Sequence, residues 1–169
     1  TFIVSYGTTF LEMEKSIFVN ATIIAAIINA LAIVYSGHLS DRWGRRRVYM
    51  TGVILLMLWA FPYYWLVNTK SVGLIMLATI IAMVFHGMLY GPQAAMIAEN
   101  FPTRLRYSGA SLGYQLASII AGGPAPLVST WLLHKYGSAT AISFYIVVMG
   151  LISLAGVKML KDRARQAIE

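Results

Sequence analysis

Five long apolar stretches dominate this sequence of 169 residues. They run over residues 18–37, 48–67, 72–98, 108–133 and 140–160. A helix of about 20 predominantly apolar residues is long enough to cross the hydrocarbon core of a bilayer. Residues 1–10 are too few to span alone, and we interpret them as the last turns of a sixth helix that begins before this sequence. We therefore predict an all-α integral membrane protein with five complete spans and one partial span.

The composition argues against a soluble domain and against an enzyme. Apolar residues make up 59% of the chain and charged residues 11%, whereas soluble domains have roughly 45–50% and about 25%. Cysteine is absent, and the three histidines and six acids show no metal-ligand spacing. No nucleophile and base pair stands out either. We therefore expect no metal, no cofactor and no catalytic site.

The thirteen basic residues are unevenly divided between the two sides of the predicted bundle. Short loops make successive spans antiparallel, so consecutive loops lie on opposite sides. The positive-inside rule then places the more basic side in the cytoplasm together with the C-terminus, and the net charge of +7 requires no nucleic acid. The basic residues are, on the cytoplasmic side, Arg42, Arg45, Arg46, Arg47, Arg104, Arg106, Lys158, Lys161, Arg163 and Arg165, and, on the other, Lys15, Lys70 and Lys135.

Aromatic residues gather where the second complete span ends. Trp59, Tyr63, Tyr64 and Trp65 are the amphipathic type that collects at the membrane–water interface. We expect them to form an interfacial belt.

A glycine- and arginine-rich motif joins the first two complete spans. Glycines permit a tight turn, a carboxylate can act as a helix-terminal acceptor, and arginines bind the anionic leaflet. A generic basic hairpin would explain the arginines alone. The motif resembles the signature of the major facilitator superfamily at Gly37, Leu39, Ser40, Asp41, Arg42, Gly44, Arg45, Arg46 and Arg47.

A second segment, residues 98–115, is similar to the loop before the eleventh helix in the metabolite:proton symporter branch of that superfamily. The glycine and proline break at 122–127 and the Tyr6 region are similar to the same branch. The resemblance implies the C-terminal six-helix half of a twelve-helix permease in the bacterial inner membrane, with helix seven partial and helices eight to twelve complete. It implies a small organic acid or osmolyte as solute, a proton as coupling ion, and an N-terminal half as partner. Residues 48–67 and 140–160 carry few polar side chains through their middles, so we expect these spans to face lipid, as the ninth and twelfth helices of that family do.

Two other functions stay open on these residues. One is a membrane scaffold or receptor of the same fold that does not transport. The other is a facilitator-type transporter of another branch, for a sugar or a drug.

Uncharged polar residues form faces on three spans and are the candidates for a solute cavity. The helical period places Thr79, His86, Tyr90 and Gln93 on one face of 72–98. Polar groups inside a membrane face a cavity or bond to a neighbouring helix, and both interpretations stay open. The cavity candidates are Tyr6, Asn29, His86, Tyr90, Gln93, Tyr114, Gln115 and Ser118. A series of small residues, opposite Gln115, predicts close helix packing at Gly109, Gly113, Ala117 and Ala121.

Charged residues avoid the centre of every complete span, so His86 is the one side chain there that could titrate near neutral pH. A coupling carboxylate would lie in the other half, if one exists. Glu99 stands at the cytoplasmic end of its span, where Arg104, Arg106 or Arg45–Arg47 could pair with it. An exposed ion pair of little energetic weight is the alternative. The predicted gating group is Gly37, Asp41, Arg42, Gly44, Arg45, Arg46, Glu99, Arg104 and Arg106.

Overall fold

The fold is a bundle of long helices, seen in a computed structural model that describes residues 2–160. The backbone over these residues contains helices and no strand, which confirms the all-α prediction. Five helical segments are long and apolar enough to cross a membrane, the fourth being the continuous run Thr103–Tyr136. The elements are α1 (Phe2–Thr9), α2 (Lys15–Trp43), α3 (Arg45–Asn68), α4 (Val72–Ala98), the 3₁₀ turn η1 (Thr103–Leu105), α5 (Arg106–Ala117), the π-helical segment η2 (Ser118–Gly122), α6 (Pro124–Tyr136) and α7 (Thr140–Met159).

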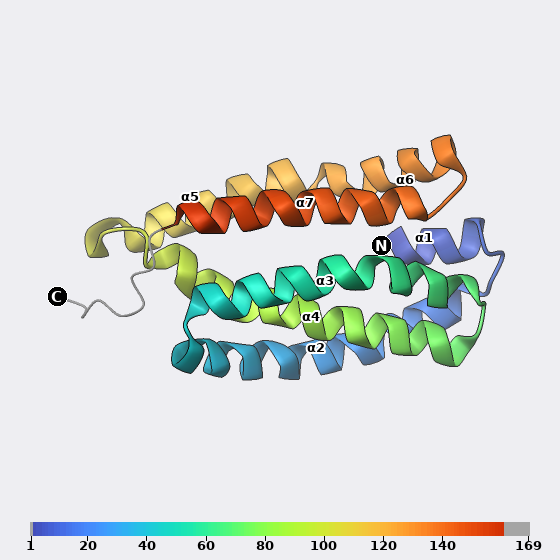
Figure 1. The fold of residues 1–169 in the computed structure, drawn as a ribbon, viewed down its shortest axis with the longest axis horizontal. Helices are drawn as coiled ribbons and strands as arrows, with labels where there is room; N and C mark the ends of the chain where they lie inside the picture. The colour runs from blue at the N-terminus through green and yellow to red at the C-terminus, as the bar shows by residue number, and fades with distance from the viewer. Residues whose placement is uncertain (1, 161–169) are drawn as a thin grey trace.

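The loops alternate between the two ends of the bundle (Figure 1). The α2–α3 turn and the α4–α5 connection lie at one end, which we call the arginine-rich end. The α1–α2, α3–α4 and α6–α7 loops lie at the opposite end. The loops predicted to share a side therefore do so. Lys161, Arg163 and Arg165 of the predicted cytoplasmic tail lie outside the described residues.

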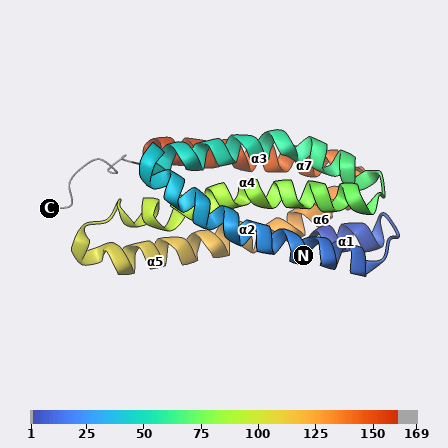
Figure 2. The same cartoon turned by 90° about the horizontal axis from the view of Figure 1, so that it is seen from below.

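Helix α4 is the centre of the larger group of helices. It packs along both α2 and α3, while α7 packs on the other side of α3 and contacts α6. Helix α5 touches α4 only over a short length and otherwise stands apart from α2, as Figure 2 shows from below. Much of α5 is consequently exposed in this chain.

Glycines on α4 allow it to lie against the backbone of α2. A Cβ added at Gly87 would lie 2.7 Å from the Ala32 Cβ, and one at Gly91 would lie 2.7 Å from the Ile33 carbonyl oxygen. Gly37 of the motif sits inside α2 at this contact, so it serves helix packing rather than the turn. Without a hydrophobic force between helices in lipid, such close packing is a main source of their association.

A single residue separates α2 from α3. Helix α2 continues to Trp43, well past the predicted boundary at 37, and α3 begins at Arg45. Gly44 between them has φ +93°, a conformation that favours glycine. The motif therefore lies mostly on helix ends and turns at Gly44 alone.

The predicted break in the fourth complete span is confirmed. The α-helical pattern changes to a π-helical turn over Ser118–Gly122 and resumes at Pro124, the first residue of α6. Proline suits a first helical position because it has no backbone N–H to satisfy there. The span is thus one path across the membrane built from two α-helices.

The buried aromatic cluster at the opposite end corrects the predicted belt. Tyr64 is only 7% exposed and packs edge-on against the buried Tyr6, with ring centroids 5.7 Å apart. Trp59 turns inward as well, since its Nε1 donates to the Ala78 carbonyl at 3.2 Å. Trp65, by contrast, is 80% exposed, as a residue facing the membrane interface would be. Two of the expected belt residues thus hold helices together instead.

Helices α3 and α7 present exposed apolar stripes, in keeping with the lipid-facing prediction for residues 48–67 and 140–160. The two helices are joined by a hydrogen bond in which Ser143 Oγ donates to the Ala60 carbonyl at 2.8 Å. A second bond joins Tyr49 and Ser153 at 3.0 Å. The stripes consist of Ile54, Leu58, Phe61 and Trp65 on α3 and Phe144, Val148, Leu151 and Ile152 on α7.

Candidate functional site

A polar aromatic group connects α4 with α5. The His86 and Tyr90 rings stack on α4 with centroids 5.8 Å apart. From α5, the Tyr114 hydroxyl donates to the Tyr90 hydroxyl at 3.2 Å. His86 and Tyr90 are exposed in this chain, with Tyr90 at 46%. Three of the predicted cavity residues therefore form one open wall, which is also an interhelical contact.

A cavity of about 520 Å³ lies between α4, η1 and α5 on the arginine-rich side of Tyr114. Its polar lining comes from Thr103, Arg106, Ser111, Tyr114 and Gln115. Alanine and isoleucine side chains of α4 supply much of the apolar lining. The volume falls in the range of small-molecule sites, about 300–1,000 Å³. The predicted residues Tyr114 and Gln115 thus line a space of suitable size for a metabolite.

Three further predicted residues do not line the cavity. Gln93 is half-buried on α4, and Ser118 is exposed where η2 begins. On α2, the Asn29 Oδ1 atom is buried and has no hydrogen-bond partner within residues 2–160. A buried acceptor of that kind suits either a bound solute or a group outside the described residues.

Tyr6 and Thr79 lie apart from the wall. Tyr6 belongs to the aromatic cluster at the opposite end, is 5% exposed, and donates to Asn68 Oδ1 at 2.6 Å. Thr79 is buried, and its hydroxyl donates to the Ile75 carbonyl one turn back at 2.8 Å. The prediction that Thr79 shares a polar, cavity-facing side of α4 is therefore corrected, because Thr79 is buried and the backbone of its own helix satisfies its hydroxyl.

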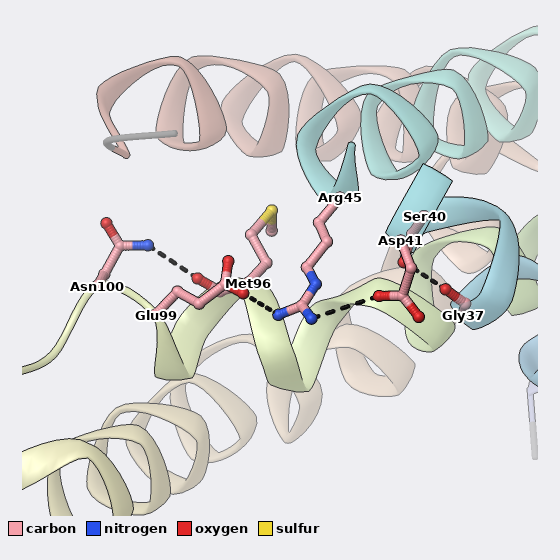
Figure 3. A network of polar contacts seen from close by, with 7 residues as sticks. All are labelled: Gly37, Ser40, Asp41, Arg45, Met96, Glu99 and Asn100. Carbon is pink, nitrogen blue, oxygen red and sulfur yellow. Dashed lines mark hydrogen bonds and ion pairs between the residues drawn. The ribbon is translucent and has the colours of Figure 1, made fainter. Parts of the chain in front are cut away.

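An ion-pair network ties α3 to α4 at the arginine-rich end (Figure 3). The Arg45 guanidinium donates through Nη1 to Glu99 Oε1 and through Nη2 to Asp41 Oδ1, the latter at 3.4 Å. The Arg45 and Glu99 side chains are only 25% and 27% exposed, whereas Asp41 is 61% exposed. Solvent screening makes the Asp41 contact the weaker of the two. Glu99 is therefore braced by Arg45, and Arg104 and Arg106 are not its partners.

Other members of the predicted gating group occupy separate places. Arg46 Nη2 donates to the Lys158 carbonyl at 3.3 Å, which caps the end of α7. Arg42 and Arg104 are exposed. Arg106 lines the cavity, so the structure places it with the solute candidates rather than with the brace.

Membrane-length helices, an open polar wall beside a metabolite-sized cavity and a charged brace at one end define a class of protein. They are the features of a polytopic α-helical membrane protein.

The chain belongs to the Major Facilitator Superfamily, whose family model matches residues 5–168. The shikimate transporter of Escherichia coli K12 is 31% identical over 97% of this chain and 38% of its own length. The proline/betaine transporter of Escherichia coli K12 is 28% identical over 87% and 29%. The citrate-proton symporter of Klebsiella pneumoniae is 28% identical over 98% and 37%. These relatives are transporters and not enzymes.

The chain therefore spans only about a third of the length of the curated relatives it matches. No solved structure matched it. The predicted resemblance to the metabolite:proton symporter branch is confirmed by these relatives.

The sequence analysis did not anticipate that Arg106 lines the cavity. The signal was present in the spacing, because Arg106 precedes Tyr114 by eight residues, which is just over two helical turns. The two side chains therefore share one side of α5. We expected Arg106 among the possible partners of Glu99, whereas Arg45 binds that carboxylate.

Proposed function

We propose that this chain is the C-terminal half of a secondary transporter in the bacterial inner membrane. It moves a small organic acid or osmolyte together with a proton, by alternating access, and its C-terminus is cytoplasmic. The observation that carries the proposal is the open wall of His86, Tyr90 and Tyr114 beside the cavity. A polar surface on membrane-spanning helices needs a water-filled path or a partner to face.

The partner is an N-terminal half of the same permease. Helix α2 exposes an apolar row that no element within residues 2–160 covers, and α5 exposes another. A second bundle on these faces would enclose the wall between the two halves. The rows contain Ile23, Ile27, Leu31 and Val34 on α2 and Leu112 and Leu116 on α5.

The charge distribution supports the proposed orientation. At the arginine-rich end, Arg45 holds both Asp41 and Glu99, which leaves a strong excess of positive charge for the cytoplasmic leaflet. Opening and closing at this end would require the Arg45–Glu99 pair to form and break. That pair is therefore the natural cytoplasmic brace of the transport cycle.

Uptake by the full-length protein in membrane vesicles tests the proposal. With an imposed proton gradient, we expect accumulation of shikimate, citrate or glycine betaine, and loss of accumulation when a protonophore is added. Absence of uptake for every organic acid and zwitterion would refute transport and favour a scaffold or receptor. Uptake that is insensitive to the protonophore would refute proton coupling alone.

A further inference from the structure

The apolar stripes of α3 and α7 form one continuous outer face of the bundle. The Phe61 ring of α3 and the Phe144 ring of α7 pack edge-on, with centroids 5.2 Å apart. The two stripes therefore lie side by side, on the same side of the helix pair. Their side chains are exposed within residues 2–160. Since lipid tails are as apolar as such side chains, the natural neighbours of this face are acyl chains.

A basic side chain ends each stripe at the arginine-rich end. On α3, the exposed Arg47 precedes Ile54 and Leu58 at helical spacing, so the three side chains share one side of the helix. On α7, the exposed Lys158 in the last turn follows Leu151 by seven residues, or about two turns. Helix α7 ends at the same end of the bundle where α3 begins (Figure 1). The apolar face is therefore headed by positive charge from both helices.

Arg46 adds a third positive charge at the junction of the two helices. Its Nη2 atom donates to the Lys158 carbonyl oxygen at 3.3 Å, so its guanidinium is held against the end of α7. That acceptor is neutral, and the bond leaves the charge of the guanidinium uncompensated. A guanidinium has five N–H donors, and the remaining ones can bind a phosphate.

The described carboxylates do not neutralise these three bases. Asp41 and Glu99 both pair with Arg45. Glu12 and Glu14 lie in the α1–α2 loop at the opposite end of the bundle. Among residues 2–160, the three bases therefore form no ion pair, and an anion from outside the chain would complete the charge balance.

The length of the apolar face below the bases matches one leaflet of a bilayer. Leu58 follows Arg47 by eleven residues, which is about 16 Å along a helix. Val148 precedes Lys158 by ten residues, which is about 15 Å. Half of a hydrocarbon core of about 30 Å is likewise about 15 Å. A phosphate held by the bases would thus place its acyl chains along both stripes, whereas a free phosphate would leave them unused.

We propose that this face binds one anionic glycerophospholipid, with its phosphate held by Arg46, Arg47 and Lys158 and its acyl chains lying along the stripes of α3 and α7. We call it the α3–α7 lipid site. Its ligand has a net negative headgroup, because a zwitterionic headgroup would bring a cation to a place that is already positive. The inference requires only that the helices span a membrane, so it does not depend on the proposed transport function.

The probe is a phosphatidylglycerol with a photoreactive group in one acyl chain, titrated into the full-length protein in detergent. Crosslinks are assigned to α3 and α7 by peptide mass spectrometry, and the lipid concentration that half-saturates them is measured. At about 0.15 M salt, exposed charges more than about 8 Å apart are largely screened. Local and diffuse attraction can therefore be separated by substitution.

The double variant Arg46→Gln/Lys158→Gln is compared with Arg42→Gln/Arg104→Gln, which removes the same charge from the same end of the bundle. Arg42 and Arg104 are exposed, and their elements α2 and η1 do not contact α7 in the described part of the chain. Each basic residue at an anionic surface contributes roughly fivefold in affinity. We expect the first double variant to raise the half-saturating concentration about 30-fold and the control to raise it less than about threefold.

Lys158→Gln alone serves if the double variant fails to insert, because this exposed side chain is not part of the packing between helices. It should weaken crosslinking about fivefold. Unlabelled phosphatidylglycerol should displace the probe, while phosphatidylcholine with the same chains should require at least about tenfold more.

Several outcomes would overturn the α3–α7 lipid site. One is an equal loss in the two double variants, which would show diffuse attraction to surface charge. Others are an unchanged affinity in Lys158→Gln, crosslinks that avoid α3 and α7, or displacement by phosphatidylcholine at the same concentration as phosphatidylglycerol. Displacement by glycerol phosphate, the headgroup without chains, would instead identify a binding site for soluble anions.

Discussion

Helices α2 and α4 are in such close contact at Gly87 that adding a single methyl group there should destabilise the bundle. The Cβ of Gly87→Ala would lie 2.7 Å from the Ala32 Cβ and 3.1 Å from both the Ala32 carbonyl carbon and the Ile33 nitrogen. Non-bonded carbons prefer about 3.5–4.0 Å, so the new methyl is roughly 1 Å too close. Overpacking of this kind costs about 1–3 kcal/mol. We expect Gly87→Ala to lower the free energy of unfolding by that amount.

The assay is unfolding of the full-length protein in mixed micelles as the fraction of denaturing detergent rises. Gly73→Ala is the matched control on the same helix, because an added Cβ there meets nothing within 4 Å. Ala32→Gly in the Gly87→Ala background removes one clash and leaves the two backbone contacts, so it should restore part of the stability. The coupling energy should be about 0.5–3 kcal/mol. Equal unfolding of Gly87→Ala and Gly73→Ala would refute the close packing of α2 on α4.

Four further substitutions test the wall, the brace and the outer helices. Tyr114→Phe removes the hydroxyl bond to α4, and we expect the solute dissociation constant to rise about two- to tenfold with normal insertion; an unchanged constant would remove Tyr114 from the wall. Glu99→Gln should slow turnover more than it weakens binding, and Asp41→Asn should slow it less, since that carboxylate is more exposed. Equal turnover in both would contradict this ranking. Ser143→Ala should cost about 0.6 kcal/mol of unfolding free energy in the detergent titration.

The existence of each span could be predicted from hydropathy, but its ends could not. The span predicted at 72–98 matches α4, because polar residues follow it at once. The span predicted at 18–37 ends before α2 does, at Trp43. Hydropathy marks only the apolar part of a helix, whereas the helix itself continues as long as its backbone hydrogen bonds continue. Arg42 in the last turn of α2 is charged and still belongs to the helix.

The position of a side chain could be predicted from the sequence only where it depends on the periodicity of a single helix. The shared face of His86 and Tyr90 follows from the helical period, and their ring stacking confirms it. Tyr6 and Tyr64 depend on which helix lies beside them, and Tyr6 meets Tyr64 from more than fifty positions away. The partner of Glu99 depended in the same way on how α3 approaches α4. Periodicity carries no information about such neighbours.

The side chains of two neighbouring arginines at the start of α3 bind the ends of two different helices. Arg45 binds Glu99 at the end of α4, and Arg46 binds the Lys158 carbonyl at the end of α7. Gly44 alone connects this turn to α2. Four helix ends thus share one joint, so a displacement at the brace is transmitted to α7 on the outer side of the bundle. In the proposed transport cycle, opening at this end would therefore move α7 together with α2, α3 and α4, and we expect the lipid around α7 to affect its rate.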